Sequence, residues 1–404
     1  MKPLSFIHIA DIHLGYEQYN LSVRREDFAR AFHEAVEKSL ELMPDFIIIA
    51  GDLFHQARPS NKTLENAVQN FRRLREAGIP VLVVDGSHDA APNIITGTIL
   101  NPLDSAGLIY YLPRHENACW ENDSCYVYGV PNFRTRQRTE NQLPAFYELK
   151  KPKPDAAKFN IFVFHMALDI PEIMKGRPSA IAEASPDYIP EGFDYYAGGH
   201  LHTPWQLPFK GSLLVYSGST ETVSYEDANV EKGFYYVEVN GKDDIEINRI
   251  RLESPRRFKV LESDFTGYSP RKITEKAAEM VKKNDEPGVI LIPVLRGTLP
   301  AEASRGEIDL TRIRNAAEQA LLVRPLVLMK EESLPSEIIQ SIFQSNIKSL
   351  KTKAFEYFYE FFSKRYGEKQ AEKIARLTVE LVQPLVKGDE ENVKLLLEEI
   401  FGED

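Results

Sequence analysis

The chain has 404 residues, and its 49 Lys and Arg against 60 Asp and Glu give a formal net charge of −11 at pH 7. A single hydrophobic core stops growing at about 250 to 300 residues, so two or three domains are expected. The acidic balance excludes a protein that coats nucleic acid by overall attraction, although it is compatible with local basic patches.

Residues 1–252 alternate short apolar runs with amphipathic stretches, which predicts a layered α/β domain. Helices are expected over 25–42 and 62–77, where apolar residues recur on one face. The expected strands are the apolar runs at 4–10, 46–50, 80–84, 126–130, 160–165, 195–197, 213–216 and 233–239.

A second domain is expected over 253–332, after a proline and paired arginines interrupt the pattern. It has its own α/β alternation: helices at 270–283 and 310–322, and strands at 289–297 and 325–329. The third region, 333–404, is expected to be helical, with one apolar stripe formed by Ile338, Ile342, Phe343, Ile347 and Leu350.

Cys119 and Cys125, the only cysteines, bracket a probable turn. Two cysteines make no disulfide framework, so reduced thiols in the cytoplasm are favoured over a local bridge. The first residues lack the apolar core of a signal peptide, and no apolar run approaches the ~20 residues of a membrane span. We therefore expect a cytoplasmic protein that is not bound to membrane.

Polar clusters follow several expected strands, and they hold six of the nine histidines. The clusters are 10–13, 50–55, 85–90, 164–167 and 198–204. Asp11 and His13 are two residues apart, as are His200 and His202, so each pair projects to one side and can converge on one ion. Carboxylate and neutral imidazole suit divalent manganese, iron, cobalt or zinc. Asp52, after a turn glycine, can bridge two metals.

Each of these residues alone has an ordinary structural explanation, because buried histidines usually find hydrogen-bond partners and Asp after Gly is common in turns. The five clusters together favour a metal centre. His8, His33 and His115 have no second ligand type beside them, so structural roles are expected for these three.

The ordered motifs D-x-H, G-D, G-N-H-D/E, H and G-H-x-H resemble the calcineurin-like metallophosphoesterases across residues 1–250. The segments "HIADIHLGYEQYN", "GDLFHQARPS", "GHLHTPWQ" and "YSGSTETVSYED" are similar, more narrowly, to the archaeal and eukaryotic DNA double-strand-break repair nucleases whose bacterial counterpart is SbcD. This resemblance implies a β-sandwich flanked by helices, a small α/β DNA-capping domain and two divalent metal ions, most commonly manganese.

The resemblance also implies roles for individual residues. The first manganese would be held by Asp11, His13 and His202, with Asp52 as the bridge; the second would be held by His165 and His200, with Ser87 at a position that is normally Asn. His88, oriented by Asp89, would stabilise the transition state or protonate the leaving oxygen. His55 would place the phosphate.

Ser87 is the departure from this pattern, because a serine hydroxyl reaches less far than an asparagine carboxamide. Under one hypothesis Ser87 binds the metal weakly or through water, and activity falls without vanishing. Under the other hypothesis, Ser87 was introduced or has drifted, so that the site is nearly inactive.

DNA contacts are expected at Arg134, Arg136 and Arg138, which share one face if the segment is extended, and at Lys175, Arg177, Arg256 and Arg257. Ordinary solvated charge is the alternative for each. The resemblance implies a homodimer through Leu64, Val68 and Phe71, where the alternative is packing on the sheet.

The chain contains no G-x-x-x-x-G-K-[ST] loop for ATP. The family works with an SMC-like coiled-coil ATPase, for which 333–404 is the expected docking region. The leading interpretation is a manganese-dependent DNA exonuclease and endonuclease that processes double-strand-break ends. The alternatives are a phosphodiesterase or phosphomonoesterase for a small substrate, and a dimeric DNA-end-binding scaffold without activity.

Overall fold

A computed structural model describes residues 2–90, 97–175, 181–242, 244–300, 303–331, 347–387, 392–394 and 396–397. The chain divides into two compact units. The first contains Met1–Lys259 and Gly288–Ile290, and the second contains Val260–Pro287 and Leu291–Asp404. The proposed boundaries at 252 and 332 remain a prediction.

Two six-stranded sheets form the centre of the first unit. One has the order β12-β11-β1-β2-β3-β4, with β1 to β4 parallel and β11 and β12 antiparallel. Its strands are β1 (Leu4–Ile9), β2 (Phe46–Ala50), β3 (Val81–Val84), β4 (Tyr110–Tyr111), β11 (Gly233–Gly241) and β12 (Asp244–Arg251).

The other sheet has the order β5-β6-β7-β8-β10-β9, in which the four inner strands are parallel and both edge strands are antiparallel. Its strands are β5 (Cys119–Glu121), β6 (Cys125–Gly129), β7 (Phe159–His165), β8 (Tyr195–Gly199), β9 (Trp205–Phe209) and β10 (Ser212–Tyr216). Cys119 and Cys125 both have free thiols.

The sheets face one another across a shared apolar core that includes Phe6 and Phe46 from one sheet and Tyr195 from the other. The rings of Phe6 and Phe46 stack with centroids 5.3 Å apart, and Tyr195 meets Phe6 edge-on at 5.2 Å. Helices cover the outer faces, so the central strands are buried on both sides. This explains why they appear in the sequence as continuous apolar runs.

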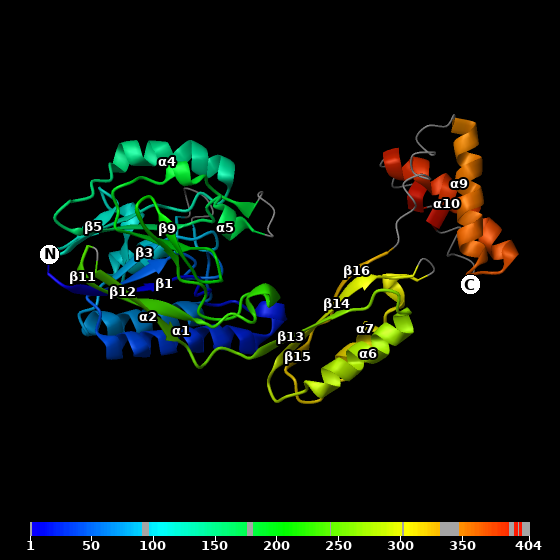
Figure 1. The fold of residues 1–404 in the computed structure, drawn as a ribbon, viewed down its shortest axis with the longest axis horizontal. Coiled ribbons are helices and arrows are strands. Elements are labelled where there is room, and N and C mark those ends of the chain that lie inside the picture. Colours follow the sequence, from blue (N-terminus) through cyan, green and yellow to red (C-terminus); the bar gives the residue numbers. More distant parts are fainter. Residues whose placement is uncertain are drawn as a thin grey trace. The chain divides into compact units, whose positions relative to one another are not determined.

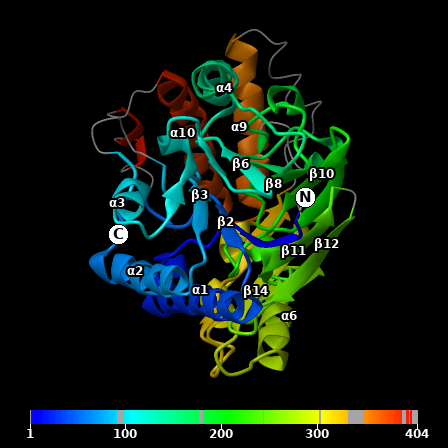
Figure 2. The ribbon, with the colours of Figure 1, turned by 90° about the vertical axis from the view of Figure 1, so that its left-hand side faces the viewer.

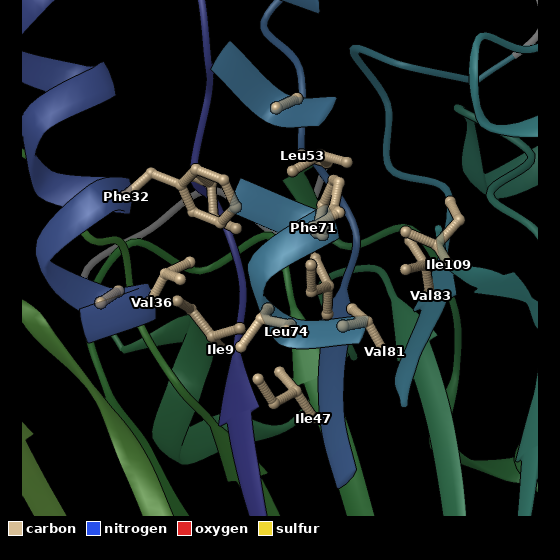
Figure 3. Close-up of a cluster of buried hydrophobic side chains, with 14 of the residues drawn as sticks. Ile9, Phe32, Val36, Ile47, Leu53, Phe71, Leu74, Val81, Val83 and Ile109 are labelled. Carbon is tan, nitrogen blue, oxygen red and sulfur yellow. The ribbon is translucent and has the colours of Figure 1, made fainter. Parts of the chain in front are cut away.

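Helices α1 (Ser22–Leu42) and α2 (Asn61–Glu76) cover the outer face of the first sheet, and α4 (Arg136–Lys150) packs on the second (Figures 1 and 2). Figure 3 shows Phe32 of α1 and Phe71 of α2 meeting over the first sheet, and their ring centroids are 5.6 Å apart. The layered α/β class and the flanked sandwich are therefore confirmed.

The dimer prediction needs one correction. Phe71 has 0% exposure within the core, so its side chain is not available to a second copy. Leu64 and Val68 are partly buried against the same core. The spacing of these three residues correctly indicated an apolar face, but that face lies mainly on the sheet.

The eight expected strands are confirmed with small shifts at their ends. The short strands β4, β5 and β9, the edge strand β12 and the helix α4 had not been expected. Short helices in the first unit are α3 (Leu100–Ser105) and α5 (Pro171–Met174).

The second unit has a four-stranded sheet in which β14 pairs with β13, β15 and β16. Its elements are β13 (Phe258–Asp264), α6 (Pro270–Lys283), β14 (Ile290–Thr298), α7 (Leu310–Arg314), β15 (Leu322–Val323), β16 (Leu326–Lys330), α9 (Ile347–Ser363) and α10 (Glu368–Lys387). The helix expected over 310–322 is thus shorter, because the chain enters β15.

Helices α9 and α10 pack against one another. Ile347 and Leu350 lie in α9, whereas Ile338, Ile342 and Phe343 of the expected stripe lie outside the described residues. Among the helices that the structure describes, none is both long enough and apolar enough to cross a bilayer.

Candidate metal centre

The polar clusters gather where parallel strands of both sheets end. Loops after β1, β2 and β3 supply residues from the first sheet, and loops after β7 and β8 supply them from the second. Side chains from these loops meet because the sheets face one another. The residues brought together are Asp11, His13, Asp52, His55, His88, His165 and His202.

The backbone is strained at four of the predicted site residues. Asp11, His13, Asp52 and His200 have φ values of 52°, 49°, 50° and 89°, in the region that side chains other than glycine rarely adopt. Such strain costs about 1–3 kcal/mol per residue and persists where the surrounding structure enforces it. The strain turns each side chain towards the shared site.

Two glycines, Gly51 and Gly86, let the predicted ligands approach the neighbouring backbone closely. A Cβ at Gly51 would lie 2.2 Å from His165 Nδ1, and one at Gly86 would lie 2.1 Å from Asp52 Oδ1. Both separations are far below van der Waals contact, so a larger residue at either position would push a predicted ligand out of place.

Asp11, His13 and His202 form one group, in which the candidate ligand atoms all lie within 4.8 Å of one another. The Nε2 atoms of His13 and His202 face each other at 3.4 Å. Two nitrogens that each lie about 2.1 Å from one ion have a separation of this size. This group therefore fits a divalent cation.

Asp11, Asp52 and His165 form an adjoining group that shares Asp11 with the first. His165 Nδ1 lies 2.8 Å from the Ala50 carbonyl and donates to it, so Nε2 carries the lone pair when the ring is neutral. That buried Nε2 lies 3.2 Å from Asp52 Oδ2 but has no hydrogen-bond partner among the described residues. A lone pair facing a carboxylate fits a cation between the two atoms.

Asp52 also reaches the first group, because its Oδ2 lies 3.8 Å from His13 Nε2. Ser87 Oγ is 3.5 Å from the same Oδ2, so the serine lies at the edge of the second group. His200 donates its backbone N–H to Asp11, and its ring meets that of His165 edge-on with centroids 5.3 Å apart. These positions are consistent with the predicted bridge and the predicted second-ion residues.

Burial keeps His13, His200 and His202 neutral, in the form that binds metal. It lowers the pKa of His200 to about 3 and the pKa of His202 to about 4, and it holds the pKa of His13 well below its usual value. At His165 burial alone would lower the pKa, but the adjacent Asp52 carboxylate raises it to about 10. Burial alone would raise the pKa of Asp52, but the adjacent His165 holds it well below its ordinary value. Asp52 is therefore an anionic ligand candidate.

His55 and His88 stack beside His13, with ring centroids 4.6 Å apart. Tyr16 stacks on the other face of the pair, 3.7 Å from the His55 centroid. The three rings form a wall at the edge of the metal-ligand groups. Sequence reasoning missed Tyr16, although it lies in the same loop as His13.

The expected pairing of His88 with Asp89 needs correction. His88 Nδ1 lies 3.0 Å from the His55 carbonyl. The Asp89 carboxylate instead accepts backbone N–H groups of Leu53 at 2.7 Å and Gly86 at 2.7 Å, and is fully buried. Asp89 thus ties the loops after β2 and β3 together, because its oxygens are already occupied by the backbone.

Two carboxylates beside the site were also missed, the partly buried Glu183 and the buried Asp227. Glu183 Oε2 lies 3.7 Å from His200 Nε2, and Asp227 Oδ2 lies 3.8 Å from His202 Nδ1. Neither belongs to a cluster that directly follows a strand. Neither has a neighbouring histidine or glycine motif in the sequence that would mark it as part of the site.

The predicted arginine track is only partly supported. The segment is not extended: Thr135 caps α4, and Arg136 and Arg138 lie in its first turn. Arg136 is paired with Glu140 and Asp169, whereas Arg138 is exposed. Arg134 donates to the Ala90 carbonyl at 2.8 Å, which places its guanidinium near the loop that carries His88.

Arg256 is occupied in a different way, since its guanidinium binds the buried Asp27 and the Gly288 carbonyl. These contacts give it a structural role and correct its assignment to the DNA track. Arg257 is exposed, and Arg177 lies outside the described residues.

Comparison with known proteins agrees with this geometry. The family model described as calcineurin-like phosphoesterase matches residues 4–204. The DNA double-strand break repair protein Mre11 of Archaeoglobus fulgidus is 32% identical over 340 residues, which cover 78% of this chain and 73% of that protein. Mre11 of Methanocaldococcus jannaschii is 33% identical over 270 residues, covering 62% and 67% of the two chains. Mre11 of Thermoplasma acidophilum is 27% identical over 343 residues, covering 82% and 85%.

Proposed function

This chain belongs to the Mre11 family of calcineurin-like phosphoesterases, and on that premise we propose that it is a manganese-dependent nuclease acting on DNA double-strand-break ends. The observation that carries the proposal is the buried His165 Nε2, which makes no hydrogen bond to the described residues and lies 3.2 Å from Asp52 Oδ2, next to the paired Nε2 atoms of His13 and His202. Both exonuclease and endonuclease cleavage are within this proposal.

The proposed ligands divide into two sets around Asp52. Asp11, His13 and His202 hold one ion, and His165, His200 and Ser87 hold the other. When bound, two such ions supply a hydroxide nucleophile and neutralise charge on the phosphoryl oxygens. Manganese accepts this mixture of carboxylate and imidazole ligands.

The stacked histidines act on the phosphodiester itself. His55 orients the phosphate, and His88 in its imidazolium form donates the Nε2 proton to the leaving oxygen and becomes neutral, which is a step worth typically about 10²–10⁴-fold in rate. The His55 carbonyl fixes Nδ1 of His88, so its Nε2 is the atom that faces the substrate. Arg134 and Arg138 contact DNA phosphates without reading sequence.

The remaining proposed partners rest on the family. A homodimer would use the partly exposed residues of α2, Leu64 and Val68. An SMC-like coiled-coil ATPase would dock on α9 and α10, where Phe361 of α9 is 36% exposed and Tyr366, between the two helices, is 44% exposed. Exposed aromatic residues on a helix pair suit an apolar groove on a partner.

The first test is cleavage of a linear DNA duplex at limiting and at excess manganese, comparing this chain with Ser87→Asn. An asparagine carboxamide extends further than serine towards the second set, so we expect affinity for the second ion and cleavage at limiting manganese to rise by about 10- to 100-fold. Ser87→Ala is the matched control and should not exceed the parent.

Loss of all manganese-dependent cleavage in both the parent and Ser87→Asn would contradict the nuclease proposal. If both variants instead cleave a small phosphodiester such as bis(p-nitrophenyl) phosphate but not DNA, the substrate assignment is wrong and the metal site stands.

A further inference from the structure

Asp227 lies behind the candidate ligand His202, on the side away from the other ligands. His202 Nε2 faces His13 Nε2 at 3.4 Å and Asp11 Oδ1 at 4.0 Å. His202 Nδ1 faces Asp227 Oδ2 at 3.8 Å. The two nitrogens of one imidazole therefore point in different directions, one towards the metal-ligand group and one towards a carboxylate.

This orientation determines which nitrogen carries the proton. An imidazole that binds a metal through Nε2 must carry its hydrogen on Nδ1, and an anionic oxygen near Nδ1 stabilises that tautomer. The separation of 3.8 Å exceeds a direct hydrogen bond, so the interaction is electrostatic or passes through one water. In a buried, low-dielectric site the electrostatic part is larger than it would be in solvent.

Asp227 is itself fixed in place. It is 3% exposed and closes a capping box with Ser224, whose backbone N–H donates to Oδ1 at 2.7 Å. Lys232, 5% exposed, donates its Nζ to Oδ2 at 2.8 Å. The ammonium group compensates the buried charge, so a carboxylate can remain anionic behind His202.

The same loop is bonded to the segment that carries His202, because Ser219 donates its backbone N–H to the His202 carbonyl at 3.2 Å. Ser219 Oγ also lies 3.3 Å from Asp227 Oδ2 and accepts from Lys232 at 3.0 Å. His165 shows the same arrangement with a different acceptor, since the Ala50 carbonyl fixes its Nδ1 and leaves Nε2 facing the metal-ligand group.

We propose that Asp227 is a positioning residue for the first metal ion: it holds His202 in the tautomer and ring orientation that present Nε2 to the ion. The proposal rests on the proposed function, because it requires His202 to be a metal ligand. Lys232 compensates the buried charge of Asp227 and so stabilises the loop, but it does not contact His202 in this arrangement.

The test measures manganese binding by isothermal titration calorimetry on the full chain, together with the melting temperature of the metal-free protein. Asp227→Asn should weaken the tighter manganese site by about 10- to 100-fold. Lys232→Met is the matched control. It removes the ammonium partner of Asp227 and should lower the melting temperature. The backbone N–H groups of Val223 and Ser224 still donate to the carboxylate, which stays anionic beside His202, so the manganese affinity should be retained.

A loop-anchoring role without any effect on His202 predicts a different pattern, in which both variants lose affinity in proportion to their loss of stability. That result would overturn the proposal. If Asp227→Asn does not fold with an orphaned ammonium group, the double variant Asp227→Asn/Lys232→Met removes both charges. It should fold and still show the weakened site, whereas parental affinity in the double variant would overturn the proposal.

Manganese binding by the parent chain distinguishes a failure of the role of Asp227 from a failure of the proposed function. If the parent binds manganese and all variants bind it equally, the role of Asp227 is wrong and the proposed function stands. If the parent binds no manganese, the proposed function fails, and the role of Asp227 fails with it.

Discussion

Asp52→Asn is expected to lower manganese-dependent DNA cleavage by about 10³-fold or more. Asp52 Oδ2 lies 3.2 Å from His165 Nε2 and 3.8 Å from His13 Nε2, so its carboxylate adjoins both ligand sets. An amide has the same shape but no charge and cannot bridge two cations. Losing several kcal/mol of charge stabilisation in the transition state lowers the rate by this factor, since each tenfold change in rate corresponds to about 1.36 kcal/mol of activation free energy.

The substitution should leave the fold intact. Asp52 Oδ1 accepts the backbone N–H of His88 at 2.9 Å, and an amide oxygen can accept the same bond. Single-turnover cleavage of a linear duplex measures the rate, and calorimetry with manganese measures how many ions bind. Asp45→Asn is the control, because Asp45 precedes the other end of the same strand and binds only the Ser5 backbone N–H at 2.7 Å. Activity of Asp52→Asn within tenfold of the parent would contradict the bridging role.

The strand ends of this site could be predicted from sequence for a specific physical reason. Parallel strands buried on both faces leave uninterrupted apolar runs, such as Phe46–Ala50, and the polar residues that follow them must lie at one edge. The spacing of Asp11 and His13 then indicated that both reach one ion. The structure brings both into a single ligand group.

Long-range neighbours could not be predicted in this way. Asp227 lies 25 residues after His202 in the sequence. The contact between them depends on how the intervening chain folds back to the strand end. Arg136 appeared as one member of an extended basic run, because its spacing gave no sign that Thr135 would start a helix. The apolar period of α2 gave the face that holds Phe71, but not what that face contacts.

A buried ion cluster also depends on long-range contacts that could not be predicted from the sequence. Its disruption has the largest expected effect on stability. Arg24 is fully buried, donates to Asp27 Oδ2 at 2.6 Å and to Gln18 Oε1 at 2.9 Å, and lies 3.2 Å from Glu221. Asp27, also fully buried, additionally binds Arg256. The i,i+3 spacing of Arg24 and Asp27 indicates that these two meet on one helix. Nothing in the sequence indicates that Glu221 and Arg256, some 200 residues away, join them.

Asp27→Ala is expected to reduce the free energy of unfolding by about 3–5 kcal/mol, because removing one partner leaves buried charge uncompensated. Urea unfolding followed by circular dichroism measures the change. The double variant Arg24→Met/Asp27→Leu tests the cause, since replacing both charges with apolar groups of similar volume is often neutral or stabilising. If the double variant is as unstable as Asp27→Ala, uncompensated charge is not the reason for the loss.

The pH dependence of stability gives an independent measure of the same cluster. Burial alone would raise the pKa of Asp27, but hydrogen bonds from Arg256 and Arg24 hold it below its ordinary value. A carboxyl whose pKa is lower in the folded state stabilises the fold at pH values above the unfolded pKa of about 3.9, and this contribution disappears as pH falls through the folded pKa. The parent chain should therefore lose stability below about pH 4 more steeply than Arg24→Met/Asp27→Leu, which has no carboxyl at this position to titrate. Parallel stability curves for the two proteins between about pH 5 and 2 would show that Asp27 does not contribute in this way.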